Sequence, residues 1–295
     1  RKKLHNKLLD LQGNIRVVCR VRPVLEMERR SGEGVDVTEI PNDEELFIQR
    51  DAQAKTRYEY DKVYKQDSSQ EEVFGIVQPL CVSVLDGFNV CIFAYGQTGS
   101  GKTFTMEGYG ADRGVSPRAI AELLNQAEIS VRYSFTLSML EIYNETILDL
   151  LGPPAKEKTK LDIRQTADGN QVVGLTETKV STVQQVEALM EKGKKNRAVG
   201  SHDMNEHSSR SHSIITLVCR GENLVDSGTT FGKLHLIDLA GSERVGKTDA
   251  VGEQLKEAQA INKSLSALGE VINALGNKKA THVPYRNSKL TFLLQ

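Results

Sequence analysis

The 295-residue sequence contains no tryptophan, only four cysteines and no excess of charge of either sign. Its 38 basic and 39 acidic side chains leave a formal charge of −1, so the whole molecule has no general attraction to nucleic acid or to an anionic membrane. The cysteines show no CxxC spacing, and Cys19, Cys91 and Cys219 stand in apolar runs. This usage favours packed thiols in a reducing, cytosolic setting over disulfides or a metal site.

Long hydrophobic runs are absent as well. No apolar stretch approaches the ~20 residues that span a bilayer, and the basic N-terminus lacks the apolar core of a signal peptide. The sequence therefore predicts a soluble, intracellular chain without membrane insertion. With 39% hydrophobic residues and no Pro/Gly/Ser-rich linker, it predicts one large α/β domain rather than two.

Apolar periodicity predicts alternating strands and helices along most of the chain. Helical spacing occurs over 68–87, 116–126, 182–197 and 253–276, whereas strand-like runs occupy 15–21, 89–95, 133–143, 212–221 and 232–240. The run 89–95, "NVCIFAY", is continuously apolar, as in a strand buried on both faces of a largely parallel sheet. We therefore expect three layers: a central, mostly parallel, twisted sheet with helices on both faces.

The first 13 residues have a different pattern. Leu4, Leu8 and Leu11 recur at four-then-three spacing, which suits the seam of a coiled coil or the stripe of an amphipathic helix. So short a helix is marginal alone. Taken by itself, this stretch fits a dimer neck and a frayed helical arm equally well. The leucine pattern ends at Gly13.

A phosphate-binding loop follows the apolar run 89–95. Residues 96–103, "GQTGSGKT", fit GxxxxGK[ST], and "GKTFTM" would begin the next helix, which is the context that the motif requires. Glycines let successive backbone N–H groups face a phosphate, while the lysine meets the β- and γ-phosphates and the hydroxyl meets magnesium. The candidate binding residues are Gly96, Gln97, Thr98, Gly99, Ser100, Gly101, Lys102 and Thr103.

Two further segments suit a phosphate site. Asp238, Gly241 and Glu243 form DxxGxE after an apolar strand, although DxxG alone also suits a strand-ending turn. Residues 205–212, "NEHSSRSH", gather hydroxyls and an arginine. A serine hydrolase is disfavoured because no GxSxG elbow occurs, and His207 and His212 lack the Cys or carboxylate cluster of a metal site.

Taken in order, "FAYGQTGSGKT", "NEHSSRSH" and "DLAGSE" closely resemble the three nucleotide motifs of the kinesin motor domain. "CRVRP", "INKSL" and "HVPYRNSKLT" resemble its other hallmarks, so the resemblance runs from Asn14 to Gln295. It implies a P-loop NTPase-type fold, ATP/ADP and Mg²⁺ as cofactors, and a microtubule-stimulated ATPase that moves along microtubules. A guanine-nucleotide switch is disfavoured because no NKxD is present.

The junction "LQGNIRVVCRVRP" resembles that of kinesins whose motor lies at the C-terminus, which move toward microtubule minus ends. The resemblance implies that 1–13 are the end of a coiled-coil neck, which pairs with a second chain in a homodimer or heterodimer, and that 14–295 are the motor domain. It also implies a location on cytoplasmic microtubules, with the spindle as an open option. The family pattern continues past Gln295 into a strand and a helix, which are therefore expected to be absent from this chain.

Site residues carry over from the resemblance position by position. Arg20, Arg22 and Pro23 would flank the adenine, with Phe104 close by. The expected magnesium residues are Thr103 and Ser209, with Asp238 behind them.

The same resemblance implies the catalytic residues Ser208, Ser209, Arg210, Gly241 and Glu243. Ser208 would help to place the attacking water. The Gly241 N–H would donate to the γ-phosphate, and Arg210 and Glu243 would form an ion pair that closes over it.

No acidic residue follows Glu270, whereas basic residues gather there. By composition alone this is a solvated charged face, but the resemblance implies a surface for acidic tubulin, consisting of Lys278, Lys279, His282, Arg286 and Lys289, with Lys247 added from the preceding loop. Two alternatives stay open: a non-catalytic, kinesin-like microtubule-binding partner, and a P-loop nucleotide switch that recognises another acidic protein.

Overall fold

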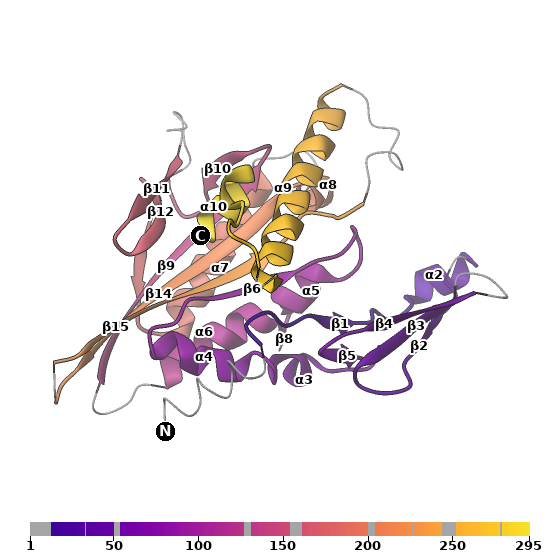
Figure 1. Ribbon diagram of the computed structural model, residues 1–295, viewed down its shortest axis with the longest axis horizontal. Coiled ribbons are helices and arrows are strands. Elements are labelled where there is room, and N and C mark those ends of the chain that lie inside the picture. Colours follow the sequence, from indigo (N-terminus) through magenta and orange to yellow (C-terminus); the bar gives the residue numbers. More distant parts are fainter. Residues whose placement is uncertain are drawn as a thin grey trace. The chain divides into compact units, whose positions relative to one another are not determined.

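The structure is a computed structural model (Figure 1). It describes residues 13–32, 34–49, 54–126, 131–153, 161–199, 204–225, 227–243, 252–277 and 279–295. The predicted neck, 1–13, therefore lies outside the described residues except for Gly13. The chain divides into two compact units, 1–75 and 76–295, which are described separately below.

The first unit is built from short strands and helices. Strands β2, β3 and β4 form an antiparallel three-stranded sheet, and β1 pairs with β5 in parallel. Helix α3 begins with a capping box, in which the Ser69 hydroxyl accepts from the Glu72 N–H at 3.1 Å and the Glu72 carboxylate accepts from the Ser69 N–H at 2.7 Å. The elements are β1 (Val18–Arg20), α2 (Glu26–Arg30), β2 (Thr38–Glu39), β3 (Glu45–Gln49), β4 (Lys55–Glu59), β5 (Lys62–Tyr64) and α3 (Gln70–Phe74).

The second unit contains the long strands and helices. Its first half comprises α4 (Gln78–Leu85), β6 (Val90–Ala94), α5 (Lys102–Met106), β7 (Gly108–Tyr109), β8 (Asp112–Arg113), α6 (Val115–Asn125), β9 (Val131–Tyr143), β10 (Thr146–Asp149), β11 (Asp162–Thr166) and β12 (Gly169–Val173). Its second half comprises β13 (Thr178–Val180), α7 (Val183–Val199), α8 (Met204–Ser209), β14 (His212–Asn223), β15 (Thr229–Asp238), α9 (Glu253–Gly276), η2 (Tyr285–Asn287) and α10 (Lys289–Leu293).

A six-stranded sheet forms the centre of this unit, in the order β10–β9–β14–β15–β6, with β13 also paired to β9. Only β6 and β15 run parallel among its described pairs, in the register Ile92↔Leu236. The α/β fold class is confirmed, but the expectation of a mostly parallel sheet is wrong. Strands β9, β14 and β15 are covered on both faces and therefore have the apolar sequences of parallel strands, although they pair antiparallel.

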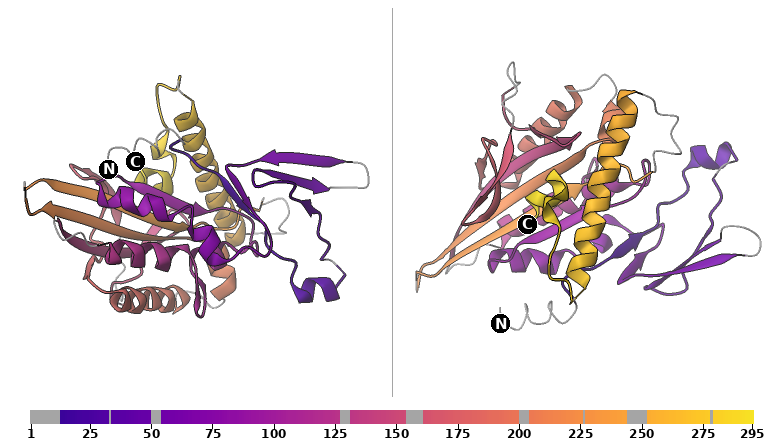
Figure 2. Two further views of the ribbon diagram at one scale, coloured as in Figure 1. Left: turned by 90° about the horizontal axis from the view of Figure 1, so that it is seen from below. Right: turned by 45° about the horizontal axis from the view of Figure 1, so that its top comes forward.

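Helices cover both faces of the sheet, and Figure 2 shows α6 and α7 on the side opposite α9. Side chains alternate between the faces because successive residues of a strand point in opposite directions. Leu140 and Ile142 of β9 belong to a core cluster with Leu268 of α9 and Leu290 of α10. Met139, the residue before Leu140, lies on the other face against Gly193 of α7, where a Cβ would overlap its side chain.

The predicted helices at 116–126, 182–197 and 253–276 are confirmed as α6, α7 and α9. The helix expected over 68–87 is divided into α3 and α4, with Pro79 at the start of α4. Proline fits the first turn of a helix because it has no N–H to donate. Within the described residues, none of the helices has both the length and the apolarity to cross a membrane.

Candidate nucleotide site

The phosphate loop lies between β6 and α5, as the motif predicts. Gly99 and Gly101 have φ values of 78° and 89°, a conformation that side chains disfavour. The Lys102 ammonium donates to the carbonyl oxygens of Gly96 and Gln97, both at 3.0 Å. Burial lowers the pKa of Lys102, and the nearby Asp238 and Glu243 carboxylates partly offset this effect. Lys102 thus connects the two ends of the phosphate loop by binding backbone carbonyl oxygens at its start.

Thr103 and Asp238 connect the loop to the end of β15. The Thr103 hydroxyl donates to Asp238 Oδ2 at 2.6 Å, and the Asp238 side chain is buried. Its second oxygen, Oδ1, has no hydrogen-bond partner among the described residues. Burial raises the pKa of Asp238, and the hydrogen bond from Thr103 partly counteracts it. A hydroxyl beside a buried carboxylate with an unused oxygen suits Mg²⁺, which prefers oxygen ligands and retains waters.

Two backbone hydrogen bonds join the three sequence motifs. The Gly241 N–H donates to the Ser209 carbonyl at 2.7 Å, and the Ser242 N–H donates to the Gly96 carbonyl at 3.1 Å. The loop after β15 therefore contacts both the phosphate loop and the end of α8. Residues 96–103, 205–212 and 238–243, which are far apart in the sequence, converge at one place in the second unit.

Glu243 is bound to the phosphate loop. Its carboxylate accepts from the Thr98 N–H at 2.9 Å and from the Thr98 hydroxyl at 2.5 Å. Burial acts to raise the pKa of Glu243, but the two hydrogen bonds from Thr98, a further backbone hydrogen bond and the charge of Lys102 together lower the net pKa. A side chain at position 241 would displace the Thr98–Glu243 contact, because a Cβ there would overlap the Thr98 hydroxyl and the Glu243 carboxylate.

The expected Arg210–Glu243 ion pair is not the pairing in the structure. Arg210 Nη1 donates instead to Glu257 Oε2 of α9 at 2.8 Å, and the hydroxyl of Tyr143 donates to the other oxygen of Glu257. The expectation differs because each charged group has a partner that the motifs do not reveal. Thr98 supplies two donors to Glu243, and α9 supplies a carboxylate to Arg210.

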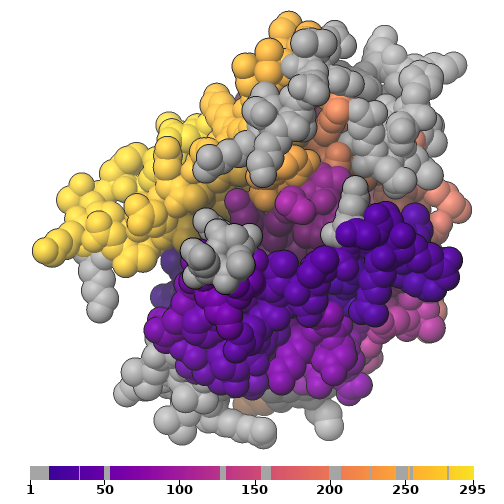
Figure 3. Space-filling view, turned by 90° about the vertical axis from the view of Figure 1, so that its right-hand side faces the viewer, coloured from indigo at the N-terminus to yellow at the C-terminus, as the bar shows by residue number. Residues whose placement is uncertain are grey.

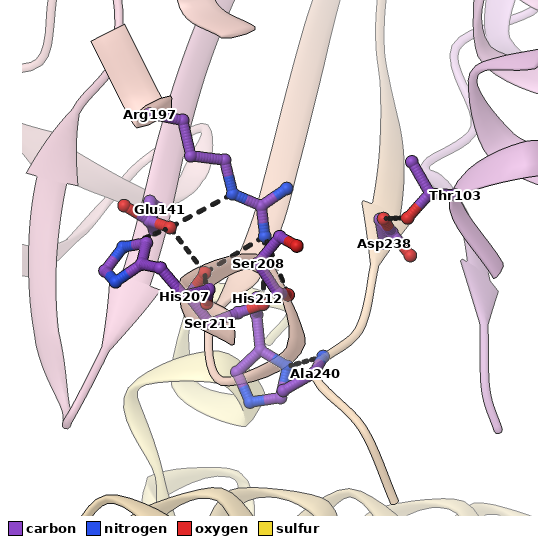
Figure 4. A network of polar contacts seen from close by, with 9 residues as sticks. All are labelled: Thr103, Glu141, Arg197, His207, Ser208, Ser211, His212, Asp238 and Ala240. Atoms are coloured by element: carbon purple, nitrogen blue, oxygen red, sulfur yellow. Dashed lines mark hydrogen bonds and ion pairs between the residues drawn. The ribbon is translucent and has the colours of Figure 1, made fainter. Parts of the chain in front are cut away.

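A buried carboxylate, Glu141 of β9, anchors the segment around α8 (Figure 4). Its Oε1 accepts from Arg197 Nε at 3.1 Å and lies 3.1 Å from His207 Nε2, and the hydroxyl of Ser211 donates to it as well. Arg197 Nη2 also donates to the carbonyl oxygens of Ser208 and Ser211, at 3.3 and 3.2 Å. These contacts fix the main chain on both sides of Arg210.

Comparison with known proteins assigns the chain to a family. The family model described as the kinesin motor domain matches residues 20–295. The chain belongs to the kinesin motor-domain family. Two relatives are the kinesin-like proteins KIN-14E of Oryza sativa subsp. japonica, 50% identical over 300 residues, and KIN-14S of Arabidopsis thaliana, 48% identical over 301 residues. Each alignment covers the whole chain but only 28% and 39% of the relative.

Solved structures agree with this assignment. The C-terminal motor and motor homology domain of Kar3Vik1, fused to a synthetic heterodimeric coiled coil, has a TM-score of 0.89 at 39% identity and covers 100% of this chain and 79% of its own. The motor domain of the Saccharomyces cerevisiae kinesin-related protein Kar3 has a TM-score of 0.83 at 39% identity and covers 96% and 88%. The predicted resemblance to kinesins with a C-terminal motor is confirmed.

The residues expected to flank the adenine belong to the first unit of this kinesin motor domain. Arg20 donates to the Gln70 side chain at 2.9 Å and to the Ser68 carbonyl at 3.1 Å. Arg22 makes a bidentate ion pair with Glu28, in which Nη1 donates to Oε2 at 3.0 Å and Nη2 donates to Oε1 at 2.6 Å. Pro23 is exposed, as is Phe104 of the second unit. Their contact with adenine stays a prediction.

The predicted basic surface divides into exposed and paired side chains. Lys279, His282 and Arg286 are exposed, and the Arg286 guanidinium lies 5.5 Å from the ring centre of Phe292. Lys289 instead pairs with Asp162. Lys247 and Lys278 lie outside the described residues. Figure 3 shows α9 and the residues after it, in gold and yellow, together on one face of the molecule.

Sequence reasoning missed three residues that position the site. Glu257 stands in an amphipathic helix without a motif of its own, Glu141 stands in an apolar strand, and Arg197 is the last residue of the helix predicted over 182–197. The one usable signal was Glu141, because a carboxylate in an apolar run requires a buried partner.

Proposed function

We propose that this chain is a motor ATPase that couples hydrolysis of ATP to movement along microtubules toward their minus ends. The observation that supports it most directly is the convergence of the three motifs through the Gly241–Ser209 and Ser242–Gly96 hydrogen bonds. Similarity to KIN-14 and Kar3 motor domains supports the same activity and direction. The chain spans only part of those curated relatives, so the activity of the whole protein belongs to this proposal.

Nucleotide binding requires Lys102 to change its partners. It would leave the carbonyl oxygens of Gly96 and Gln97 and approach the β- and γ-phosphates, whose charge favours the ammonium form. Mg²⁺, when bound, would neutralise phosphate charge and polarise the transferred group. The hydroxyls of Thr103 and Ser209 would hold it, with Asp238 accepting from Thr103 and using its second oxygen, Oδ1, for a water.

Recognition of the γ-phosphate requires the loop after β15 to move. The Gly241 N–H now donates to Ser209, so it must leave that carbonyl to donate to a phosphate oxygen. A hydrogen bond to a charged group contributes ~1.5 to 3 kcal/mol. Driving a two-state element from 1:99 to 99:1 takes ~5.5 kcal/mol, so one such contact is insufficient.

An exchange of partners by two charged side chains would supply the rest of this free-energy difference. Arg210 would leave Glu257, Glu243 would leave Thr98, and the two would pair over the phosphate. Ser208 lies close to Arg210 in the chain and would then orient the attacking water. After phosphate release the partners in the structure return. The exchange links the nucleotide to α9, because Glu257 belongs to that helix.

The partner surface is basic. Exposed Lys279, His282 and Arg286 follow α9, and acidic tubulin would be steered to such a surface. Lys247 and Lys278 would extend it. The first 13 residues would form a coiled coil with a second chain, and the protein would localise to cytoplasmic microtubules, with the spindle as one option.

The decisive test pairs an ATPase assay with cosedimentation. We expect microtubules to raise the hydrolysis rate of the purified chain, and we expect more chain to cosediment with a non-hydrolysable ATP analogue than with ADP. Lys102→Ala should abolish both effects, since it removes the ammonium group that would contact the β- and γ-phosphates. Lys195→Ala is the matched control, because Lys195 is exposed on α7 and pairs only with Glu191 among the described residues.

Each alternative predicts a different result. A non-catalytic kinesin-like partner would cosediment without hydrolysing ATP. A nucleotide switch for another acidic protein would bind ATP but would not cosediment. Direction is tested by gliding of polarity-marked microtubules on the chain with its native neck, and plus-end movement would contradict the proposed polarity.

A further inference from the structure

His212, the first residue of β14, connects the loop after β15 to α9. The side chain is buried, with 3% of its surface exposed. The Ala240 N–H lies 3.1 Å from its Nδ1, and the Ser264 hydroxyl of α9 lies 2.7 Å from its Nε2 (Figure 4 shows the first contact). Ala240 immediately precedes Gly241, whose N–H contacts Ser209.

The direction of every hydrogen bond in this chain of contacts is determined. A backbone N–H can only donate, so Nδ1 of His212 must accept from Ala240. The ring proton of neutral histidine is then on Nε2, which donates to Ser264 Oγ. The Ser264 hydroxyl in turn donates to the Ile261 carbonyl at 2.8 Å. Burial lowers the pKa of His212 to about 4, with a smaller effect from Arg197, so the ring stays neutral near pH 7.

We infer that His212 is a positioning residue that transmits displacement of Ala240 at the nucleotide site to α9 through Ser264. The inference rests on the proposed function and names a connection that supplements the covalent one. Residues 244–251 connect the loop after β15 to α9 along the chain. His212 connects the same loop to the same helix by side-chain hydrogen bonds in the protein interior. Leaving a buried polar group without its hydrogen-bond partner costs free energy. A shift of Ala240 must therefore either move His212 and Ser264 with it or break the Ala240–His212 or His212–Ser264 hydrogen bond at that cost.

The sheet supplies a matched control. His235 of β15 is also buried, and its Nδ1 lies 3.0 Å from the Thr216 hydroxyl of β14. This pair therefore lies within the sheet and does not bridge to α9. Ser264→Ala and His212→Asn test the connection, and Thr216→Val and His235→Asn are the corresponding controls. In His212→Asn the introduced amide oxygen can still accept from the Ala240 N–H, but the shorter side chain does not reach Ser264.

The first measurement is hydrogen exchange of α9 amides with and without a non-hydrolysable ATP analogue, which needs neither hydrolysis nor microtubules. We expect the analogue to change exchange in the wild type and in both controls. In Ser264→Ala and His212→Asn the change should be smaller by about fivefold, which corresponds to ~1 kcal/mol. The double variant should lose no more than either single variant, because both interrupt one connection.

The second measurement is the ATPase rate. We expect the two test variants to lose about fivefold in the ratio of microtubule-stimulated to basal kcat, with KM for ATP changed less than about twofold. Thermal unfolding shows whether test and control variants are destabilised alike. If the test variants keep the wild-type response, or the controls lose it equally, the inference is overturned. A wild type whose α9 responds to the analogue but which does not hydrolyse ATP would instead contradict the proposed function alone.

Discussion

Both charged side chains that were expected to pair over the phosphate already have partners. Glu243 accepts two hydrogen bonds from Thr98, and Arg210 pairs with Glu257. The side chain of Arg210 is 27% exposed and that of Glu257 16%, so this ion pair is only partly screened by solvent. A change to the expected Arg210–Glu243 pair would therefore have to break contacts that both side chains already make.

Replacing Glu243 tests the exchange of partners. Glu243→Ala should still bind ATP, because Lys102 and the loop backbone remain, but its microtubule-stimulated kcat should fall by at least about tenfold. The physical reason is that Arg210 loses the carboxylate with which it would pair in the closed state. Steady-state ATPase assays with nucleotide-binding titrations measure both quantities. Glu222→Ala, at an exposed position of β14, is the control, and a near-normal rate in Glu243→Ala would refute the exchange.

His235 makes stability depend on pH. Burial, followed by the positive charge of Lys233, lowers the pKa of His235 to about 4, whereas an unfolded histidine titrates near 6.5. Between these values the unfolded chain binds a proton that the folded chain does not, so the free energy of unfolding decreases as pH falls.

We therefore expect His235→Asn to have a shallower pH dependence than the wild type between pH ~6.5 and ~4, by roughly 1 kcal/mol per pH unit. Urea unfolding at pH 7, 6 and 5 measures the slope. Parallel curves for the two proteins would show that the side chain does not stay neutral in the folded state.

Among the secondary-structure elements, β9, α7 and α8 are connected by the buried Glu141. Its Oε1 atom accepts a hydrogen bond from Arg197 of α7, and the side chains of His207 and Ser211 contact the same atom. A buried carboxylate without its cation is costly, because the charge stays out of water and is no longer compensated. This network therefore holds α8 in place against the sheet, and α8 ends next to Arg210.

Removing the cation should expose that cost. Arg197→Met is expected to lower the free energy of unfolding by ~3 to 5 kcal/mol. Glu141→Gln in the same chain should recover part of it, since the unpaired charge is then gone. Chemical denaturation measures both. Lys195→Met, exposed on the same helix, should stay within about 0.5 kcal/mol of wild type. An Arg197→Met protein as stable as this control would show that the ion pair is not structural.

Across the molecule, a near-zero net charge conceals an uneven distribution. The exposed cations after α9 include Lys279 and Arg286, whereas Lys289 is neutralised by Asp162. An acidic filament would be attracted to the exposed cations, and salt would screen that attraction over ~8 to 10 Å. Among the described residues, Lys289 therefore adds less net positive charge to the predicted surface than Lys279 and Arg286 do.

Lys279→Ala with Arg286→Ala should weaken microtubule cosedimentation and flatten its dependence on salt, while basal hydrolysis changes little. Adding Lys289→Ala should have a smaller further effect, because Asp162 already compensates that charge. Arg132→Ala with Lys179→Ala removes the same charge from exposed positions elsewhere in the second unit and serves as the control. An unchanged salt curve in the Lys279 and Arg286 variant would contradict the proposed surface.

Local patterns in the amino-acid sequence were sufficient to predict the phosphate loop, the helices α6, α7 and α9, and the main strands of the sheet. Each of these depends on neighbours a few residues apart: glycines that accept a positive φ, a lysine at the right spacing, and apolar residues at a period of two or 3.6. Even the family could be identified, because "GQTGSGKT", "NEHSSRSH" and "DLAGSE" are contiguous motifs.

The pairing of charged groups and the direction of the strands became known only from the folded chain. Arg210 and Glu257 are separated by 47 positions, and Thr98 and Glu243 by 145, so no periodicity connects them. Strands covered on both faces are apolar whether they pair parallel or antiparallel, which is why the antiparallel β9–β14–β15 arrangement was not foreseen. Nearby residues set the conformation of each segment, whereas hydrogen bonds and ion pairs depend on which distant segments meet.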